Sequence, residues 1–218
     1  TKQEEALHYL SDGETSFVGY GGAAYGGKSW LAAAWITTMS LRYPDTAWGL
    51  GRKELVTLKK TTFVTLFKVF SEMGMKAGRD FSFNGQLGVL TFFNKSQIFL
   101  IDMAKKPSDP LYTRFGGYEL TGAVVDESAE VPYDAIKILF TRLGRRNNDK
   151  YGIKAKLLET FNPVKNHVYN RYWKPYRDNR MPKGTAFVRA LPTDNPSPDV
   201  GEYIKNILIT GDTVTIER

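Results

Sequence analysis

The chain has 218 residues, 42% of them hydrophobic and 24% charged, which suffices for one sizeable core and argues against a disordered chain. No apolar run approaches the roughly 18 residues of a transmembrane helix, no secretory signal pattern opens the chain, and the absence of cysteine excludes disulfides and thiolate metal sites. The net charge of +7 is typical of a protein with a polyanionic partner such as nucleic acid, although a basic surface that faces only water would produce the same balance.

Hydrophobic periodicity and glycine or proline breaks predict strands that alternate with helices. In the first part of the chain, we expect a helix over 1–10, a strand over 15–20, a helix over 28–43 that Pro44 ends, a strand over 46–53 and a helix over 54–73. Residues 81–103 should form β-rich hairpin material with a turn at Asn84-Gly85. We then expect a strand over 121–127, a helix that runs to about 143, and a strand over 155–161 that Asn162-Pro163 ends. The last segment should hold a helix rich in Tyr and Trp, a strand over 185–191 and a short helix over 200–208. This alternation predicts an α/β fold around a largely parallel sheet, with 81–103 as an antiparallel extension.

A glycine-rich loop joins the first strand to the helix that follows it. Residues 22–29 read GAAYGGKS and fit the pattern G-x-x-x-x-G-K-[ST] without mismatch. Glycines such as Gly22, Gly26 and Gly27 let backbone N–H groups turn inward around an anion, and the helix N-terminus adds a partial positive charge. Lys28 can reach the β- and γ-phosphates of a nucleotide, and the Ser29 hydroxyl can bind Mg²⁺. The loop is therefore predicted to bind ATP phosphates, whereas no role is assigned to Tyr25.

Two neighbouring acids end the apolar strand of residues 121–127. A phosphate-binding loop needs a metal-binding carboxylate at the end of a nearby strand, and Asp126 is placed to be that ligand. Glu127 follows it and can face the attacking water instead, which makes Glu127 our candidate general base for ATP hydrolysis. The pair favours an ATPase over a GTPase, and no guanine-reading N-K-x-D stretch occurs in the chain.

Phosphoryl transfer also requires positive charge on the γ-phosphate, often from a neighbouring subunit. Arg52 ends the second predicted strand, Arg114 precedes the strand that leads to Asp126, and Arg142 follows that strand. We rank Arg114 first, as a catalytic finger that acts in trans. A surface ion pair is the alternative role for each of the three.

With these motifs in this order, the chain resembles the ATPase domain of the large terminase subunit, the DNA-packaging motor of tailed bacteriophages. The resemblance lies in four segments: KQEEAL (2–7) looks like the adenine motif, GGAAYGGKS (21–29) like the Walker A loop, GYELTGAVVDESAEVP (117–132) with LFTRLGR (139–145) like the Walker B strand and the helix after it, and ETFNP (159–163) like the coupling motif. By this resemblance, Gln3 contacts the adenine base, and Thr160 and Asn162 sense the γ-phosphate. Phe161 stands where the family often has glycine.

The resemblance implies a P-loop NTPase of the additional-strand catalytic-glutamate type, with a core over 1–165 and a small lid subdomain over 166–218. It implies ATP and Mg²⁺ as cofactors, and double-stranded DNA, a portal protein and a small terminase subunit as partners. The working form would be a homo-oligomeric ring of five subunits at the viral procapsid portal in the host cytoplasm, without a membrane.

Full-length large terminases add a nuclease with clustered carboxylates. The sequence starts at Thr1 and ends abruptly in a strand-like pattern, so we expect a fragment of a longer protein. The acids after residue 170 are scattered, so we expect no nuclease activity in this fragment. Basic segments at 53–60, 142–146 and 170–180 are candidates for contacts with DNA phosphates or are simply solvated faces. The aromatic residues near 169–176 are more typical of packing than of base stacking, because duplex DNA hides its base faces.

Two other functions stay open at the level of the sequence. One is a helicase- or recombination-type ATPase that acts on single-stranded nucleic acid. The other is a nucleotide-switched binding module, which would hydrolyse ATP slowly. Glu127 argues against the switch, because a switch gains little from a strong base.

Overall fold

The computed structural model describes residues 1–22, 26–194, 201 and 205. Within these residues, eight strands form one sheet in the order β3-β4-β5-β2-β6-β7-β1-β8. Their bounds are β1 (Phe17–Gly22), β2 (Ala47–Arg52), β3 (Phe81–Asn84), β4 (Val89–Phe92), β5 (Gln97–Asp102), β6 (Gly122–Val125), β7 (Leu157–Phe161) and β8 (Thr185–Ala190). Each strand expected from the sequence up to residue 191 is confirmed.

The sheet is parallel except at one end. The pairs from β5 through β2, β6, β7 and β1 to β8 are all parallel, whereas β3 pairs with β4 and β4 with β5 in antiparallel fashion. The antiparallel extension is therefore confirmed for β3 and β4. The prediction was wrong for β5, which belongs to the parallel body: its side chains Ile98, Leu100 and Ile101 are all buried, as is typical of a strand covered on both faces.

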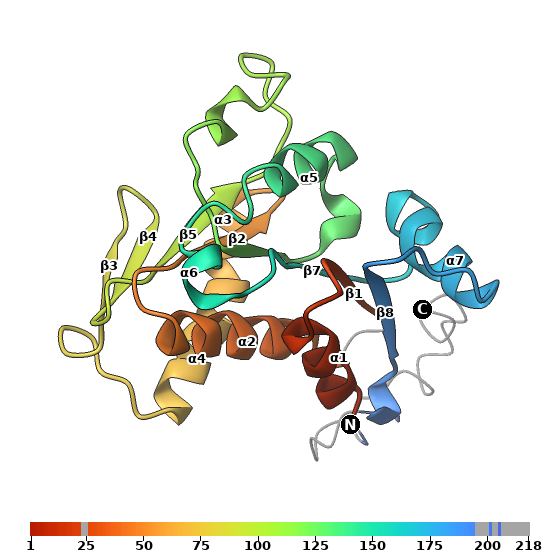
Figure 1. Ribbon diagram of the computed structural model, residues 1–218, viewed down its shortest axis with the longest axis horizontal. Coiled ribbons are helices and arrows are strands. Elements are labelled where there is room, and N and C mark those ends of the chain that lie inside the picture. The colour runs from red at the N-terminus through yellow and green to blue at the C-terminus, as the bar shows by residue number, and fades with distance from the viewer. Residues whose placement is uncertain (23–25, 195–200, 202–204, 206–218) are drawn as a thin grey trace.

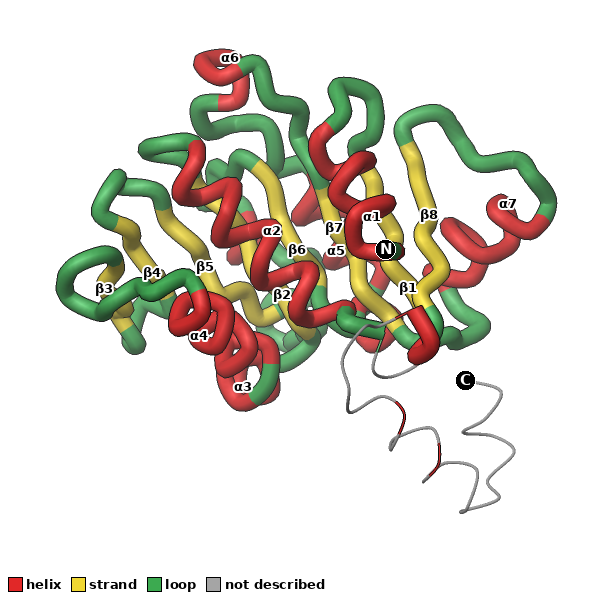
Figure 2. The backbone as a smooth tube through the Cα atoms, turned by 90° about the horizontal axis from the view of Figure 1, so that it is seen from below, coloured by secondary structure: helices red, strands yellow, loops and turns green. Residues whose placement is uncertain are grey.

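Helices cover both faces of this sheet. The helices are α1 (Lys2–Ser11), α2 (Lys28–Arg42), α3 (Leu55–Lys60), α4 (Thr62–Glu72), α5 (Tyr133–Phe140), α6 (Asn148–Tyr151) and α7 (Lys174–Arg177), and the short helical turns are η1 (Thr113–Phe115), η2 (Ser128–Glu130), η3 (Tyr169–Trp173) and η4 (Pro192–Asp194). Figure 1 shows α5 on one side of the sheet and α2 on the other. In Figure 2, α1, α2 and α4 lie together in front of the strands. No helix of the described residues is both long and apolar enough to span a bilayer.

Each face of the sheet has its own hydrophobic core. The larger core packs α1, α2 and α4 on the sheet, with Leu31, Ile36 and Leu66 facing strand residues such as Leu50 and Leu158. The second core packs α5 against the opposite face through Ala135, Ile136 and Leu139. Because alternate residues of a strand point to opposite faces, a strand between two such layers is apolar throughout, as Ala123–Val125 of β6 are.

The helix expected over 54–73 is interrupted, which corrects the prediction. Thr61 has φ −123° and ψ −83°, outside helical values, so α3 ends before it and α4 begins at Thr62. Arg52 Nη1 donates to Thr61 Oγ1 at 2.7 Å, and Thr62 Oγ1 donates to a carboxylate of the site described below. Tertiary hydrogen bonds thus outweigh the helical tendency of this segment. The helix expected after Glu127 is also shorter than predicted, since α5 ends at Phe140.

The sheet continues past residue 165, where the resemblance leads us to expect a boundary between the core and a lid. β8 pairs with β1 along its full length and forms the edge of the main sheet. Between β7 and β8, the expected helix is present as η3 and α7. Its buried Tyr172 packs on Phe161 and Phe187, so packing is the observed role of this ring. The division at residue 165 stays a prediction. Tyr25 and the helix predicted over 200–208 lie outside the described residues, apart from residues 201 and 205.

Candidate nucleotide site

The residues singled out in the sequence follow three adjacent strands. β6, β7 and β1 are neighbours and run parallel, so the segments after their carboxyl ends meet at one edge of the sheet. Ligands of open α/β sheets bind at this edge. The glycine loop follows β1, Asp126 and Glu127 follow β6, and Thr160 and Asn162 lie at the end of β7.

The glycine loop turns directly into α2. Gly27 is the residue before this helix and has the left-handed values φ 70° and ψ 17°, with no hydrogen bond from a side chain of the described residues to cap the helix start. The N–H groups of the first turn therefore face the loop, where an anion can accept from them. Lys28 Nζ donates to Gly22 O at 3.1 Å and is buried. Burial lowers the pKa of Lys28, and the negative charges of Glu127 and Asp126 oppose this shift.

Gly22 of the loop is required by a neighbouring backbone, and Gly27 by its left-handed conformation. A Cβ on Gly22 would lie 1.7 Å from the Ala190 carbonyl oxygen of β8, and one on Gly27 would lie 2.3 Å from Gln3 Nε2. The Gln3 side chain thus lies against the glycine loop, although its contact with adenine stays a prediction. The loop is also held by β1, because the buried Tyr20 hydroxyl of this strand donates to Gly26 O at 3.1 Å. Burial raises the pKa of Tyr20 to about 12, which keeps this donor protonated.

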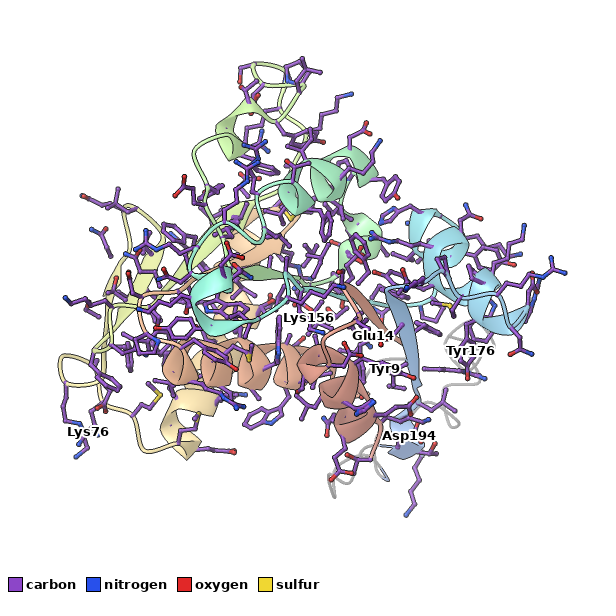
Figure 3. All side chains as sticks on the ribbon, in the orientation of Figure 1. Tyr9, Glu14, Lys76, Lys156, Tyr176 and Asp194 are labelled. Atoms are coloured by element: carbon purple, nitrogen blue, oxygen red, sulfur yellow. The ribbon has the colours of Figure 1, made fainter. Side chains whose placement is uncertain are left out.

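Helix α1, which carries Gln3, is fastened to the sheet by a buried lysine. Lys156 Nζ donates to the carbonyl oxygens of Tyr9, Asp12 and Thr15 at 2.6–2.8 Å and to Asp12 Oδ1 at 2.9 Å. Figure 3 labels Lys156 together with Tyr9 of α1. Four oxygens around one ammonium satisfy its charge in a buried position. The sequence did not indicate this contact, since a lone lysine before a strand carries no pattern.

Asp126 is a buried carboxylate with a hydroxyl on each oxygen. Thr160 Oγ1 donates to Oδ1, and Thr62 Oγ1 donates to Oδ2. Arg52 Nη1 lies 3.7 Å from Oδ2 and supplies a positive charge. The Asp126 backbone N–H donates to Gly51 O at 2.9 Å, which ties the residue to the end of β2. The sequence analysis did not identify Thr62 as a partner of Asp126. The pair Thr61-Thr62 could have indicated a break in the helix here, because threonine hydroxyls compete with helical hydrogen bonds.

Glu127 has an unusual backbone conformation and hydrogen-bond partners of its own. Its φ of 50° and ψ of 48° are left-handed, a conformation that costs a residue with a side chain about 1 kcal/mol. Asn162 Nδ2 donates to Glu127 Oε2 at 3.2 Å, and the Glu127 N–H donates to Thr160 Oγ1 at 3.3 Å. Burial and the charge of Asp126 raise the pKa of Glu127, while Lys28 and Arg52 act in the opposite direction. The two carboxylates therefore have different hydrogen-bond partners, while the backbone N–H of Glu127 shares Thr160 with the Asp126 carboxylate.

The donor set fits a magnesium ion that is shared with a nucleotide. Mg²⁺ prefers oxygen ligands and is usually held by one or two carboxylates plus phosphates. The buried Asp126 carboxylate next to a lysine-bearing glycine loop meets this condition, and the Ser29 hydroxyl lies in the first turn of α2. Among the described residues, no group of three or more His, Cys, Asp or Glu side chains could hold a metal by itself. Such an ion would depend on the phosphates of the nucleotide.

The three candidate arginines have different surroundings. Arg52 is close to the carboxylates, as described above. Arg114 is held within the chain: Nη1 donates to Asp109 Oδ2 at 2.7 Å and Nη2 to Asp102 O at 3.2 Å. Arg142 is partly exposed, and its Nε donates to the neighbouring Thr141 Oγ1 at 3.0 Å. Arg52 is thus the arginine that the structure brings to the site, whereas a role of Arg114 in a neighbouring subunit stays a prediction.

The fold matches solved structures of phage large terminases. The chain aligns with the large terminase of a thermophilic bacteriophage in complex with ADP at a TM-score of 0.70 and 17% identity, over 94% of this chain and 49% of that one. The same protein in complex with ATP-gamma-S gives a TM-score of 0.68 and 16% identity, over 94% and 48% of the two chains. The large terminase ATPase domain of Thermus phage P74-26 gives 0.65 and 12%, over 99% and 90%.

These similarities concern the fold, because all three identities are low. The chain spans about half the length of the first of these terminases, the one solved with ADP and with ATP-gamma-S. Neither a scan against protein-family models nor a search of curated proteins found a match. The chain therefore has the α/β fold of large terminase ATPase structures, with a mostly parallel sheet between helices.

Proposed function

We propose that this chain is an ATP-hydrolysing motor domain that translocates double-stranded viral DNA into a procapsid, as the ATPase domain of a large terminase subunit. The observation that carries the proposal is the pair Asp126-Glu127. Its two carboxylates have separate hydrogen-bond partners and lie beside the buried Lys28 of the glycine loop. A fold shared with terminase structures that contain ADP or ATP-gamma-S supports the same assignment.

The topology supports a P-loop NTPase of the additional-strand catalytic-glutamate type. β7 lies between β1, which leads into the Walker A loop, and β6, which leads into Asp126. It is this extra strand that delivers Thr160 and Asn162 to the two acids. The lid subdomain over 166–218 belongs to the same proposal, with the addition that β8 within that range is part of the main sheet.

The residues of the site would divide the chemistry among them. Gly22, Gly26, Gly27 and the first turn of α2 would bind phosphate oxygens, and Lys28 would reach the β- and γ-phosphates. Gln3 would contact the base. Asp126 and Ser29 would hold Mg²⁺, which when bound neutralises charge on the phosphates. Glu127 would accept a proton from the attacking water.

The coupling residues would report on the γ-phosphate. Asn162 donates to the Glu127 carboxylate, and Thr160 contacts both Asp126 and the Glu127 backbone. A change at the γ-phosphate that moves Glu127 would therefore alter these hydrogen bonds and displace the end of β7. From there, the chain continues into η3 and α7.

The partners follow from the same proposal. Double-stranded DNA, a portal protein and a small terminase subunit would bind a ring of five subunits at the procapsid portal in the host cytoplasm. The net charge of +7 suits a DNA partner. Arg114 would act in trans across the ring, after exchanging its bond to Asp109 for a phosphate of the neighbouring subunit.

ATPase assays with different nucleic acids test the function. We expect Mg²⁺-dependent ATP hydrolysis that rises on addition of double-stranded DNA and rises less with single-stranded DNA. Lys28→Ala is the matched negative control and should lack turnover, because the phosphates lose their buried cation.

The other outcomes separate the alternatives. Stimulation by single-stranded DNA alone would favour the helicase- or recombination-type ATPase. Slow hydrolysis whose rate does not change on addition of nucleic acid would favour the nucleotide-switched binding module. An absence of hydrolysis under every condition would exclude both motor hypotheses, and turnover retained in Lys28→Ala would refute the phosphate-binding loop.

A further inference from the structure

The break between α3 and α4 lies against the carboxylate that we assign to the metal. Thr61 leaves helical geometry with φ −123° and ψ −83°, and α4 starts at the next residue. Thr62 is consequently in the first turn of α4, where the residue is 1% exposed and its hydroxyl donates to Asp126 Oδ2. A continuous helix over 54–73 would give this threonine a different direction.

The Asp126 carboxylate is held from two sides. Thr160 reaches Oδ1 from β7 within the sheet, and Thr62 reaches Oδ2 from a helix that covers one face. A carboxylate with one fixed donor can still rotate about its Cβ–Cγ bond, whereas separate donors on the two oxygens determine the plane of the group. Hydroxyl donors to an ionised oxygen are short and strong, and they leave further lone pairs available for a cation.

The junction is itself fixed by the end of β2. Arg52 Nη1 donates to Thr61 Oγ1 at 2.7 Å and lies 3.7 Å from Asp126 Oδ2. The N–H of Asp126 donates to Gly51 O, one residue before Arg52. Both threonines of the helix break are thus engaged with the surroundings of Asp126, which gives the irregular backbone a physical reason.

We propose that Thr62 is a positioning residue for the metal site: its hydroxyl orients the Asp126 carboxylate for the divalent cation that binds with the nucleotide. This inference rests on the proposed function, because it takes Asp126 as the metal ligand. Partners that orient a metal ligand typically change metal affinity by 10–100-fold when they are removed.

Titration of Mg²⁺ tests the role of Thr62. Binding of ATP-gamma-S to the whole chain is followed by calorimetry, first in EDTA and then at increasing MgCl₂. For Thr62→Val, which keeps the shape and removes the hydroxyl, we expect the Mg²⁺ concentration at half-maximal enhancement of binding to rise about tenfold. Binding in EDTA should not change. Thr62→Ser should restore the wild-type midpoint, because it keeps the hydroxyl.

Thr65→Val is the matched control on the same helix. The Thr65 hydroxyl contacts only a backbone oxygen of the preceding turn, Thr61 O at 3.4 Å, among the described residues, so its loss should leave the midpoint unchanged. If Thr62→Val does not unfold cooperatively, Thr62→Ala takes its place under the same criterion.

Each result bears on one hypothesis. A wild-type midpoint in the folded Thr62 variant that lacks the hydroxyl would overturn the positioning role, as would an equal loss of binding in EDTA. If the wild-type chain shows no binding of ATP-gamma-S that depends on Mg²⁺, it is the proposed function that fails.

Discussion

Asp126 and Glu127 are neighbours in sequence, yet their side chains have different surroundings. The Asp126 carboxylate is bonded to the hydroxyls of Thr62 and Thr160, whereas the Glu127 carboxylate accepts from the Asn162 amide. The backbone of Glu127 is left-handed. One acid can therefore serve a cation while the other remains available to a water molecule.

Replacing the proposed base tests this division at the level of a residue. Glu127→Gln keeps the shape of the side chain but cannot accept a proton at neutral pH, so ATP hydrolysis should fall about 100-fold or more. Because Lys28 and the glycine loop remain intact, the dissociation constant for ATP should stay within a few-fold of wild type. Single-turnover hydrolysis and equilibrium binding measure the two quantities. Turnover close to wild type would show that another group acts as the base.

The raised pKa of Glu127 also predicts a dependence of the rate on pH. Burial and Asp126 raise this pKa above the 4.5 of an ordinary glutamate, and the base must be ionised to act. Hydrolysis should therefore decline on acidification at a pH above 4.5, and this limb should be missing from the residual activity of Glu127→Gln. An unchanged acidic limb in the variant would assign it to a different group.

Protonation of Glu127 should lower the rate of hydrolysis but raise the stability of the fold. A raised pKa in the folded state means that protonated Glu127 favours folding, and this contribution is lost as the pH rises through the folded value. Ionised Glu127 is thus a cost to stability at neutral pH. Glu127→Gln should unfold at no lower urea concentration than wild type.

At the level of elements, the position of α1 depends on a side chain from outside the helix. Lys156, which precedes β7, bonds to oxygens of Tyr9, Asp12 and Thr15 around the end of α1. The start of the same helix places Gln3 against Gly27. The Lys156 contacts therefore hold the helix whose first turn carries Gln3.

Removing the buried ammonium should loosen this helix. Lys156→Met keeps most of the apolar stem but leaves Asp12 and three carbonyl oxygens without their shared donor, and we expect a loss of about 3 kcal/mol in the free energy of unfolding. Urea denaturation measures the change. The exposed Lys154 offers a control, since Lys154→Met should change stability by less than about 0.5 kcal/mol. Equal effects of the two variants would contradict the anchor.

For the whole molecule, the order of strands decides which segments meet. β7 enters between β6 and β1, and β8 closes the sheet beyond β1 although it is the last strand of the described residues. The acids after β6 and the lysine after β1 are about a hundred residues apart in sequence. These groups lie close together because of the strand order in the sheet, and no single segment of the sequence determines that order.

The proposed ring has a consequence that a single subunit cannot show. If Arg114 acts in trans, a mixture of Arg114→Ala and Lys28→Ala proteins should hydrolyse ATP faster than either protein alone. The reason is that some interfaces then combine an intact glycine loop with an intact arginine from the neighbour. ATPase rates over a range of mixing ratios measure this effect. Rates that follow the average of the two proteins would count against the finger, and Arg142→Ala in place of Arg114→Ala is the control.

Much of the fold and the site could be predicted from local sequence. The pattern of residues 22–29, the acids at 126 and 127 and the expected strands up to residue 191 were recognisable in this way, whereas Thr160 and Asn162 were expected only from the resemblance to large terminases. Glycines, helix starts and the alternation of apolar residues reflect backbone preferences within a few residues, which the sequence displays directly.

Only the tertiary structure decided which distant groups became partners. The bond from Thr62 to Asp126 joins residues 64 apart, and that from Lys156 to Asp12 joins residues 144 apart. The break at Thr61, the parallel pairing of β5 with β2 and the place of β8 beside β1 depend on similar long-range contacts. Such contacts arise from the packing of helices on a shared sheet, so a local pattern such as Thr61-Thr62 can indicate an irregular backbone but cannot identify the distant partner. The sequence by itself therefore indicated Lys28, Asp126 and Glu127 as candidate groups, whereas only the fold revealed Thr62 as a partner of Asp126 and the way in which each group is held.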